Sequence, residues 1–369
     1  MENWRNWAAL MLALLAATIS GDAAAPFTGN PAAEVKWHPG HYIFVGHGAI
    51  REEHLTGPFR GVQKCYTWKA LEPELGQYDF SAVKADLALL QKRGRQLVMQ
   101  VQFKAFGQGA CYAPAYLKGP EFGGGVYRAS SGSYNPVIWN RQTGERLDAL
   151  LAALGKELDN HPALEAVVLP ETAPSANLNK QPQAGVEPYA DDKYLEALKL
   201  RVRALRTAFP RTAIIQYANF PPDLLPDLVA YMKEIGVGMG GPDVYPLESN
   251  LSDPKRGVYR LYAGLSGIVP LGAAVQSPNY SRALKKRTSA FDRGQDPKAV
   301  VLEPGDETPI PVREHLKLAQ DRLKLNYLFW SGHPKDCFEA VKKMLAEPGL
   351  AADPAGGLDA KLPAKTFVK

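Results

Sequence analysis

Residues 61–101 read GVQKCYTWKALEPELGQYDFSAVKADLALLQKRGRQLVMQV and contain the repeating element of the chain. An apolar run at 61–66 predicts a strand. Residues 82–93 then carry apolar side chains at helical spacing, and Gly94 ends that helix. A second apolar run at 96–101 predicts the next strand. Two strands joined by a helix are typical of a βαβ unit, in which the strands are parallel.

The same unit recurs in both directions from this stretch. The expected strands are residues 41–45, 61–66, 96–101, 164–169, 212–217, 236–240, 267–275 and 325–329. The expected helices are residues 82–93, 144–160, 192–209, 222–235, 311–324 and 336–345. Eight strands separated mostly by helices predict an α/β chain folded as a closed (β/α)8 TIM barrel over residues 36–347. Residues 348–369 are rich in Pro, Ala and Gly and are expected to form a flexible tail.

A doubly wound open sheet is the alternative fold. It would carry a Gly-rich phosphate-binding turn after the first strand. The stretch Gly46-His47-Gly48 is too short to provide that turn, so the barrel is preferred.

The composition is that of a soluble globular protein. The 369 residues are 46% apolar and 22% charged, which excludes a disordered or collagen-like chain. The net charge is +5, from 43 Lys and Arg against 38 Asp and Glu, and this is too small for a general nucleic-acid binder. Three cysteines, Cys65, Cys111 and Cys337, are too few for a disulfide scaffold but leave room for one disulfide.

Residues 1–25 have the layout of a secretory signal peptide. Arg5 precedes an apolar run at 8–19, and small residues follow up to residue 25. An uncleaved anchor is the alternative, but the run is shorter than the ~20 apolar residues that span a membrane. We therefore expect a secreted or periplasmic protein with no stable membrane anchor after cleavage.

Polar and aromatic side chains gather at the predicted strand ends, where active sites of TIM barrels lie. Aromatic rings and neutral amides in one place suit sugars, because rings stack on the apolar sugar face while amides bind hydroxyl groups. Lys64 and Lys104 are placed to meet a carboxylate or sulfate, so the expected substrate is a neutral or acidic poly- or oligosaccharide. The candidate binding residues are His47, Lys64, Tyr66, Trp68, Gln102, Lys104, Asn219, Tyr245, Gln276 and Trp330.

Two short stretches carry a resemblance to a known group. Residues 68–81, WKALEPELGQYDFS, resemble the second-strand segment of (β/α)8 glycoside hydrolases of the large retaining clan, which is clan A-like. Residues 325–330, LNYLFW, resemble the eighth strand of that clan, whose Trp forms the floor of a sugar subsite. Within the first motif, Glu72 is expected to be structural. The resemblance implies a glycoside hydrolase of unassigned family.

The resemblance also implies a catalytic glutamate at the end of strand four. Glu171 matches the clan's general acid/base there, although Pro170 replaces the usual Asn. The clan's nucleophile at the end of strand seven reads Gln276, and a neutral amide cannot form a glycosyl ester.

Several explanations of that departure stay open. A different strand alignment would bring Glu303 or Glu307 into the site. Asp243, after strand six, is the preferred second carboxylate, and a wider separation from Glu171 would give inversion. The other options are a catalytically inactive glycan-binding barrel and a polysaccharide lyase with Lys104 or Tyr245 as base. The scattered histidines show no metal-ligand spacing, so we expect neither metal nor cofactor.

Overall fold

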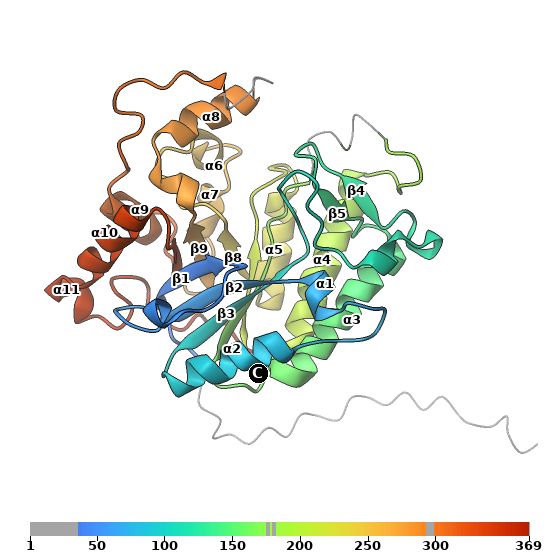
Figure 1. The fold of residues 1–369 in the computed structure, drawn as a ribbon, viewed down its shortest axis with the longest axis horizontal. Coiled ribbons are helices and arrows are strands. Elements are labelled where there is room, and N and C mark those ends of the chain that lie inside the picture. Colours follow the sequence, from blue (N-terminus) through green and yellow to red (C-terminus); the bar gives the residue numbers. More distant parts are fainter. Residues whose placement is uncertain (1–35, 175–177, 179–181, 293–298, 369) are drawn as a thin grey trace, which may run out of the picture. The chain divides into compact units, whose positions relative to one another are not determined.

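The computed structural model describes residues 36–174, 178, 182–292 and 299–368, and within them eight parallel strands form a closed barrel. The strand order around the barrel is β1-β10-β9-β8-β7-β6-β3-β2, and β1 pairs with both β2 and β10. Figure 1 shows these strands side by side, with the long helices packed around them. The (β/α)8 fold class predicted from the sequence is confirmed.

The elements lie close to where the sequence predicts them. The barrel strands are β1 (Gly40–Gly46), β2 (Gly61–Thr67), β3 (Gln96–Gln102), β6 (Leu164–Leu169), β7 (Ala213–Tyr217), β8 (Gly238–Gly241), β9 (Leu271–Val275) and β10 (Tyr327–Ser331). The longer helices are α2 (Ser81–Lys92), α3 (Arg141–Leu158), α4 (Asp191–Ala208), α5 (Leu225–Ile235), α8 (Ala283–Asp292), α9 (Val312–Asp321) and α10 (Lys335–Leu345).

Shorter elements decorate the loops. They are the helices α1 (Trp68–Leu71), α6 (Ser249–Ser252), α7 (Tyr259–Tyr262) and α11 (Pro348–Ala351), the 3₁₀ turns η1 (Glu52–His54), η2 (Ala115–Lys118), η3 (Pro120–Phe122) and η4 (Ser277–Tyr280), and the antiparallel hairpin of β4 (Val126–Arg128) and β5 (Tyr134–Pro136). The hairpin belongs to the long loop between β3 and α3, for which the sequence predicts no regular structure.

The apolar core has two layers. Side chains such as Val98, Ile215 and Phe329 fill the barrel interior, while a larger cluster packs between the strands and the helices. Gly240 is required where β8 meets β9, because a Cβ atom there would lie 2.0 Å from the carbonyl oxygen of Gly272. Close strand packing of this kind leaves a filled interior rather than a pore.

Residues near the start of β6 and β10 close the N-terminal end of the barrel. The fully buried Glu165 carboxylate accepts hydrogen bonds from the main-chain N–H of His38 at 2.6 Å and from the hydroxyl of Tyr327 at 2.7 Å. The His38 imidazole Nδ1 lies 2.8 Å from the other carboxylate oxygen. We call Glu165, His38 and Tyr327 the barrel floor.

The C-terminal segment corrects the expectation of a flexible tail. Residues 348–368 pack against the barrel, with Ala355 and Leu358 buried. Trp37 Nε1 donates to the carbonyl oxygen of Ala360 at 2.9 Å, and Arg206 donates to that of Thr366 at 2.9 Å. These bonds from distant side chains to its carbonyl groups hold the segment in place, and they cannot be predicted from its composition.

The predicted signal peptide, residues 1–25, lies outside the described residues. Among the helices that the structure does describe, none has the length and apolar character needed to cross a membrane.

Candidate active site

A cavity of about 160 Å³ opens at the carboxyl ends of the barrel strands. Its wall is made of residues in the carboxyl-terminal parts of seven strands, β1, β2, β3, β6, β7, β8 and β9, or in the loops that follow them. The lining residues are Phe44, Gly46, His47, Cys65, Gln100, Gln102, Phe106, Pro170, Glu171, Tyr217, Pro242, Ala274 and Gln276. We call this hollow the mouth cavity. It lies at the end of the barrel where TIM-barrel enzymes place their chemistry.

Glu171 follows β6 and lines the mouth cavity. Its carboxylate accepts a hydrogen bond from the side-chain amide of Asn219, which follows β7. The Asn219 amide oxygen is itself occupied, since it accepts from the main-chain N–H groups of Ala173 at 3.2 Å and Phe220 at 2.9 Å. These contacts leave the amide nitrogen of Asn219 to face Glu171, so the donor to this carboxylate is fixed.

Asp243 follows β8, next to the cavity-lining Pro242, and is held in the same way. Asn279, in η4, donates from its amide nitrogen to the Asp243 carboxylate at 2.8 Å. The amide oxygen of Asn279 accepts from the main-chain N–H of Gln276 at 2.7 Å. The orientation of this amide is therefore fixed too. Glu171 after β6 and Asp243 after β8 thus lie at the same barrel end, on the strands that flank β7, and each carboxyl group receives one preset amide donor.

The two carboxyl groups share an electrostatic environment. Burial raises the pKa of Asp243 to about 6, and the negative charge of Glu171 adds to this rise although Asn279 opposes it. Burial also raises the pKa of Glu171, against the charge of Lys104 and the hydrogen bond from Asn219. Like charges that repel in one site hold a proton to higher pH than isolated carboxyls do. Such a pair is suited to proton transfer near neutral pH.

A chain of side-chain amides forms part of the wall of the mouth cavity. Gln63 donates to the hydroxyl of Tyr217 at 2.8 Å, and Gln100 donates to the side-chain oxygen of Gln102 at 2.9 Å. Gln102 in turn donates to the carbonyl oxygen of Lys104 at 2.7 Å. This network makes that part of the wall polar and uncharged.

The structure brings together six of the residues predicted for the site. His47, Gln102, Glu171 and Gln276 line the mouth cavity, while Asn219 binds Glu171 and Asp243 is coupled to it. The His47 ring also lies 4.8 Å from the ring of Tyr112, and burial lowers its pKa.

Lys64 and Tyr66 do not line the cavity, and their placement corrects the prediction. Lys64 Nζ and the Tyr66 hydroxyl both contact the Asp86 carboxylate of α2 at 2.6 Å. Successive residues of a strand point to opposite faces. Cys65, which lines the cavity, therefore points inward, and its two neighbours point to the helix layer.

Three aromatic residues predicted as stacking surfaces are buried structural side chains instead. The indole N–H of Trp68 donates to Glu72 at 2.9 Å, and that of Trp330 donates to His41 Nδ1 at 2.9 Å. The Tyr245 hydroxyl accepts from the Lys285 main-chain N–H at 3.0 Å. None of the three lines the mouth cavity, because each ring is enclosed by neighbouring elements.

Lys104 is near Glu171 but does not face the cavity. It is 5% exposed, and its ammonium group donates to the carbonyl oxygens of Glu171, at 3.1 Å, and Ala173. The expectation that it meets a substrate anion is therefore corrected, because its hydrogen bonds are directed to the main chain. The same contacts leave it poorly placed to act as a lyase base.

Glu72 has the structural place expected of it. The fully buried carboxylate accepts from Trp68, from the main-chain N–H of Gly76 at 2.9 Å and from the Tyr116 hydroxyl at 2.7 Å, and it pairs with Arg146. The disulfide that the sequence left open is not formed, since Cys65, Cys111 and Cys337 are free.

Sequence reasoning missed Asn279 and much of the cavity wall. Asn279 lies three positions after Gln276, a spacing at which a side chain in a turn can reach back to the main chain. The spacing could therefore have predicted the bond from Asn279 to the main chain of Gln276. It does not indicate the contact between Asn279 and Asp243. The other lining residues not predicted as site residues include Phe44, Phe106, Gln100 and Tyr217.

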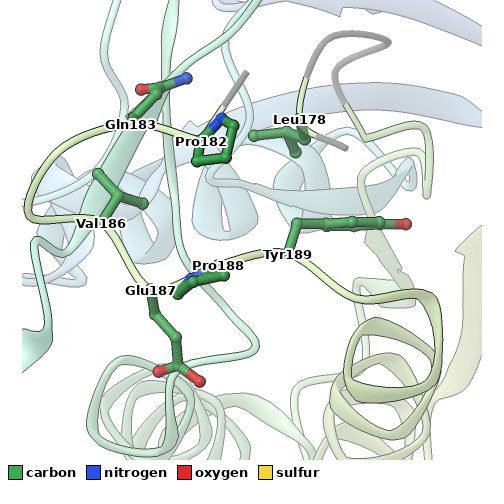
Figure 2. Close-up of a pocket in the computed structure, with 7 residues that line it drawn as sticks. All are labelled: Leu178, Pro182, Gln183, Val186, Glu187, Pro188 and Tyr189. Atoms are coloured by element: carbon green, nitrogen blue, oxygen red, sulfur yellow. The ribbon is translucent and has the colours of Figure 1, made fainter. Parts of the chain in front are cut away.

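Two further hollows lack comparable chemistry. One, of about 70 Å³, lies in the loop between β6 and α4. Figure 2 shows the Tyr189 ring on one side of it and the Glu187 carboxylate pointing away. A groove of about 620 Å³ runs between α3 and α4, but its carboxylates are paired with cations. The pairs are Glu145 with Arg141, Asp148 with Arg201, Glu187 with Lys193 and Glu196 with Lys199.

Among the described residues, no group of three or more His, Cys, Asp or Glu side chains could hold a metal ion. Glu171 and Asp243 are each bound by an amide rather than facing a shared ligand site of several carboxylates.

Comparison with protein-family models gives no match, and no curated protein matches the chain. Among solved structures, the β-galactosidase of the psychrophilic Marinomonas ef1 is similar with a TM-score of 0.53 at 10% identity, over 87% of this chain and 61% of that one. The catalytic domain of β-amylase from Paenibacillus polymyxa gives a TM-score of 0.47 at 13% identity, over 78% and 98% of the two chains. Endo-glycoceramidase II from Rhodococcus sp. gives 0.42 at 12% identity, over 80% and 73%.

The chain shares its overall fold with the Marinomonas β-galactosidase. The chain spans less than two thirds of the length of the Marinomonas β-galactosidase. Sequence identity this low establishes the fold only, and the family stays unassigned.

Proposed function

We propose that this protein hydrolyses glycosidic bonds of a poly- or oligosaccharide, with Glu171 as general acid/base and Asp243 as the second carboxylate. The observation that supports this most is the pair itself. Two carboxyl groups with raised pKa lie together at the barrel mouth, each held by an amide of fixed orientation. Hydrolysis of a glycosidic bond needs two such groups, one to give a proton and one to assist attack.

The roles follow from the positions. Glu171 lines the cavity directly and donates its proton to the glycosidic oxygen as the bond to the anomeric carbon breaks. Asp243 accepts a proton from a water molecule whose oxygen attacks the anomeric carbon from the opposite face. With a pKa of about 6, Asp243 is largely ionised at neutral pH and can accept that proton. This is an inverting reaction, and it needs no carboxylate at the position of Gln276.

The expected sugar is neutral. No Lys or Arg is among the residues that line the mouth cavity, whereas the cavity holds Glu171 and adjoins Asp243. Lys64 and Lys104, the basis for expecting an acidic substrate, make other contacts. A sugar carboxylate ~6 Å from the ionised Asp243 would be repelled by about 3 kcal/mol at an effective dielectric constant of ~20.

The test is product release from matched neutral and uronic-acid glycosides and polysaccharides. The wild type should release reducing ends from a neutral substrate, at a rate at least tenfold above that for its uronic counterpart. The double variant E171Q/D243N should lose this activity. The control E234Q/D321N changes two exposed carboxylates on α5 and α9 and should keep it. Proton NMR of the first product should show the inverted anomer.

Three results would contradict the proposal. Activity that survives in E171Q/D243N would remove the pair from the chemistry. Ultraviolet-absorbing unsaturated products would indicate a lyase. Binding of glycans without any product would favour the glycan-binding alternative, for which Gln276 in place of a nucleophile is the supporting observation.

The protein is also proposed to act outside the cytoplasm. The layout of residues 1–25 supports export, and N-terminal sequencing of protein from a culture that expresses the full chain tests it. A mature chain that begins after residue 25 is the expected result, and an intact Met1 would contradict export.

A further inference from the structure

The main chain that carries Glu171 is held by side chains of three neighbouring elements. Residues 171–173 form neither helix nor strand, so their carbonyl groups need other partners. Lys104 donates to the carbonyl oxygens of Glu171 and Ala173, and the Tyr194 hydroxyl of α4 donates to that of Thr172 at 2.7 Å. The Ala173 N–H donates to Asn219 at 3.2 Å. We call residues 171–173 the acid loop.

Lys104 is the charged member of this arrangement. Its side chain is almost completely buried, and burial lowers its pKa to about 8, so it is mostly protonated at neutral pH. A buried ammonium ion is stable only where acceptors surround it. Here the acceptors are carbonyl groups of the acid loop and not a side-chain carboxylate. The charge therefore acts on Glu171 without forming an ion pair that would block its carboxyl group.

The groups that interact electrostatically with Glu171 come from four segments of the chain. Lys104 after β3 favours the ionised carboxylate, whereas Asp243 after β8 and the Tyr194 hydroxyl of α4 interact with it as acidic groups. Asn219 after β7 adds a neutral donor. Among these described groups around Glu171, Lys104 carries the positive charge. Replacing it with a neutral side chain should shift the balance toward protonated Glu171.

We propose that Lys104 is a positioning residue for Glu171, which fixes the acid loop and places a buried positive charge beside the carboxyl group. The inference rests on the proposed function, because it assigns Lys104 to the control of proton release by Glu171. Without the charge, Glu171 would hold its proton more strongly. A hydrolase that depends on protonated Glu171 would then stay active to higher pH.

The experiment is a titration of Glu171 in the full protein, followed by NMR of ¹³C-labelled glutamate carboxyl groups. The signal that is missing in E171Q identifies Glu171. In K104Q, whose amide can still donate to a carbonyl group, the midpoint should rise by about one pH unit, a tenfold change in proton affinity. In K104R, which keeps the charge, it should stay within about 0.3 pH unit of the wild type. K156Q, which removes an exposed Lys of α3, is the control and should leave it unchanged.

Two outcomes would overturn the proposal. One is a folded K104Q or K104M whose Glu171 midpoint equals that of the wild type. The other is a K104R midpoint that rises as far as that of the neutral variants. If both neutral variants fail to fold, the K104R midpoint decides, since the proposal requires it to match the wild type.

The titration needs no substrate, so it separates this inference from the proposed function. Absence of hydrolysis by the wild type would overturn the function, and the carboxyl titration would still report the effect of Lys104. Where hydrolysis is found, the alkaline limb of the pH profile should move up in K104Q and not in K104R. A fall in kcat at an unchanged profile would contradict the electrostatic part and leave Lys104 a structural role only.

Discussion

Glu165 and Glu171 belong to opposite ends of β6, and their surroundings differ. Glu165 lies in the barrel floor, fully buried, with its two oxygens contacted by three groups of His38 and Tyr327. Glu171 accepts from one side chain, that of Asn219, and lines the mouth cavity. The oxygens of Glu165 are therefore occupied by hydrogen bonds within the protein. The carboxyl group of Glu171 can still accept a hydrogen bond from a molecule in the cavity.

The difference shows how a glutamate near a barrel strand can be assigned a role from its partners. A carboxylate with a full set of donors stabilises the fold, because its burial is compensated by hydrogen bonds. A carboxylate with a raised pKa and capacity for another partner suits proton transfer. Glu72 belongs to the first kind, with four partners including Arg146.

The largest expected effect on stability comes from replacing the Glu165 carboxylate of the barrel floor with an amide. E165Q replaces an acceptor-only group with an amide whose N–H₂ faces donors, so it should lower the free energy of unfolding by about 3–5 kcal/mol. E171Q places a neutral group at a site where burial disfavours charge, and should change the free energy of unfolding by less than about 1 kcal/mol. Urea denaturation of the two variants, at the same pH, measures the difference. Equal losses would remove the distinction between the two ends of β6.

A smaller effect tests the other member of the pair. The pKa of Asp243 is raised on folding from 3.8 to about 6, so its ionised form opposes folding. This destabilisation is absent below pH ~4, grows as the pH rises, and is complete above pH ~6. D243N removes it and should be more stable than the wild type by about 1–3 kcal/mol at pH 7.5.

The measurement is the free energy of unfolding at pH 4 and pH 7.5 for the wild type, D243N and the exposed-site control D321N. The gain of D243N over the wild type should appear at pH 7.5 and shrink at pH 4, while D321N should follow the wild type. A gain that does not depend on pH would show that the carboxyl group of Asp243 titrates normally, and would weaken its part in the pair.

The sequence predicted the barrel because its signal is repeated. Each strand is a short apolar run followed by a polar or aromatic residue, and the eight predicted runs match the eight barrel strands. The largest boundary shift is at β9, expected from residue 267 and observed from Leu271, because the main-chain N–H groups of Ile268 and Val269 donate to Leu265 in a turn and Pro270 has no N–H. Glu171 and Asp243 were predicted by the same logic, since residues that follow barrel strands lie at the mouth end of the barrel.

The sequence could not predict which residues within a strand face inward. In β2, polar side chains occupy both faces, with Gln63 in the interior network and Lys64 on Asp86. Alternation of apolar and polar residues, the usual guide to strand faces, is therefore missing. Trp330 was misplaced for a related reason, because its partner His41 lies on a strand far away in sequence. Contacts of this range leave no local pattern.

The most direct test of the role of Glu171 is the initial rate of hydrolysis by E171Q, measured beside E234Q on a substrate that the wild type cleaves. The account predicts a loss of at least a hundredfold in E171Q, the size expected for removal of a general acid, with an unfolding midpoint close to that of the wild type. It predicts a rate within twofold of the wild type for E234Q. An E171Q rate within threefold of the wild type would contradict the account and show that the carboxyl group at the barrel mouth does not carry the chemistry.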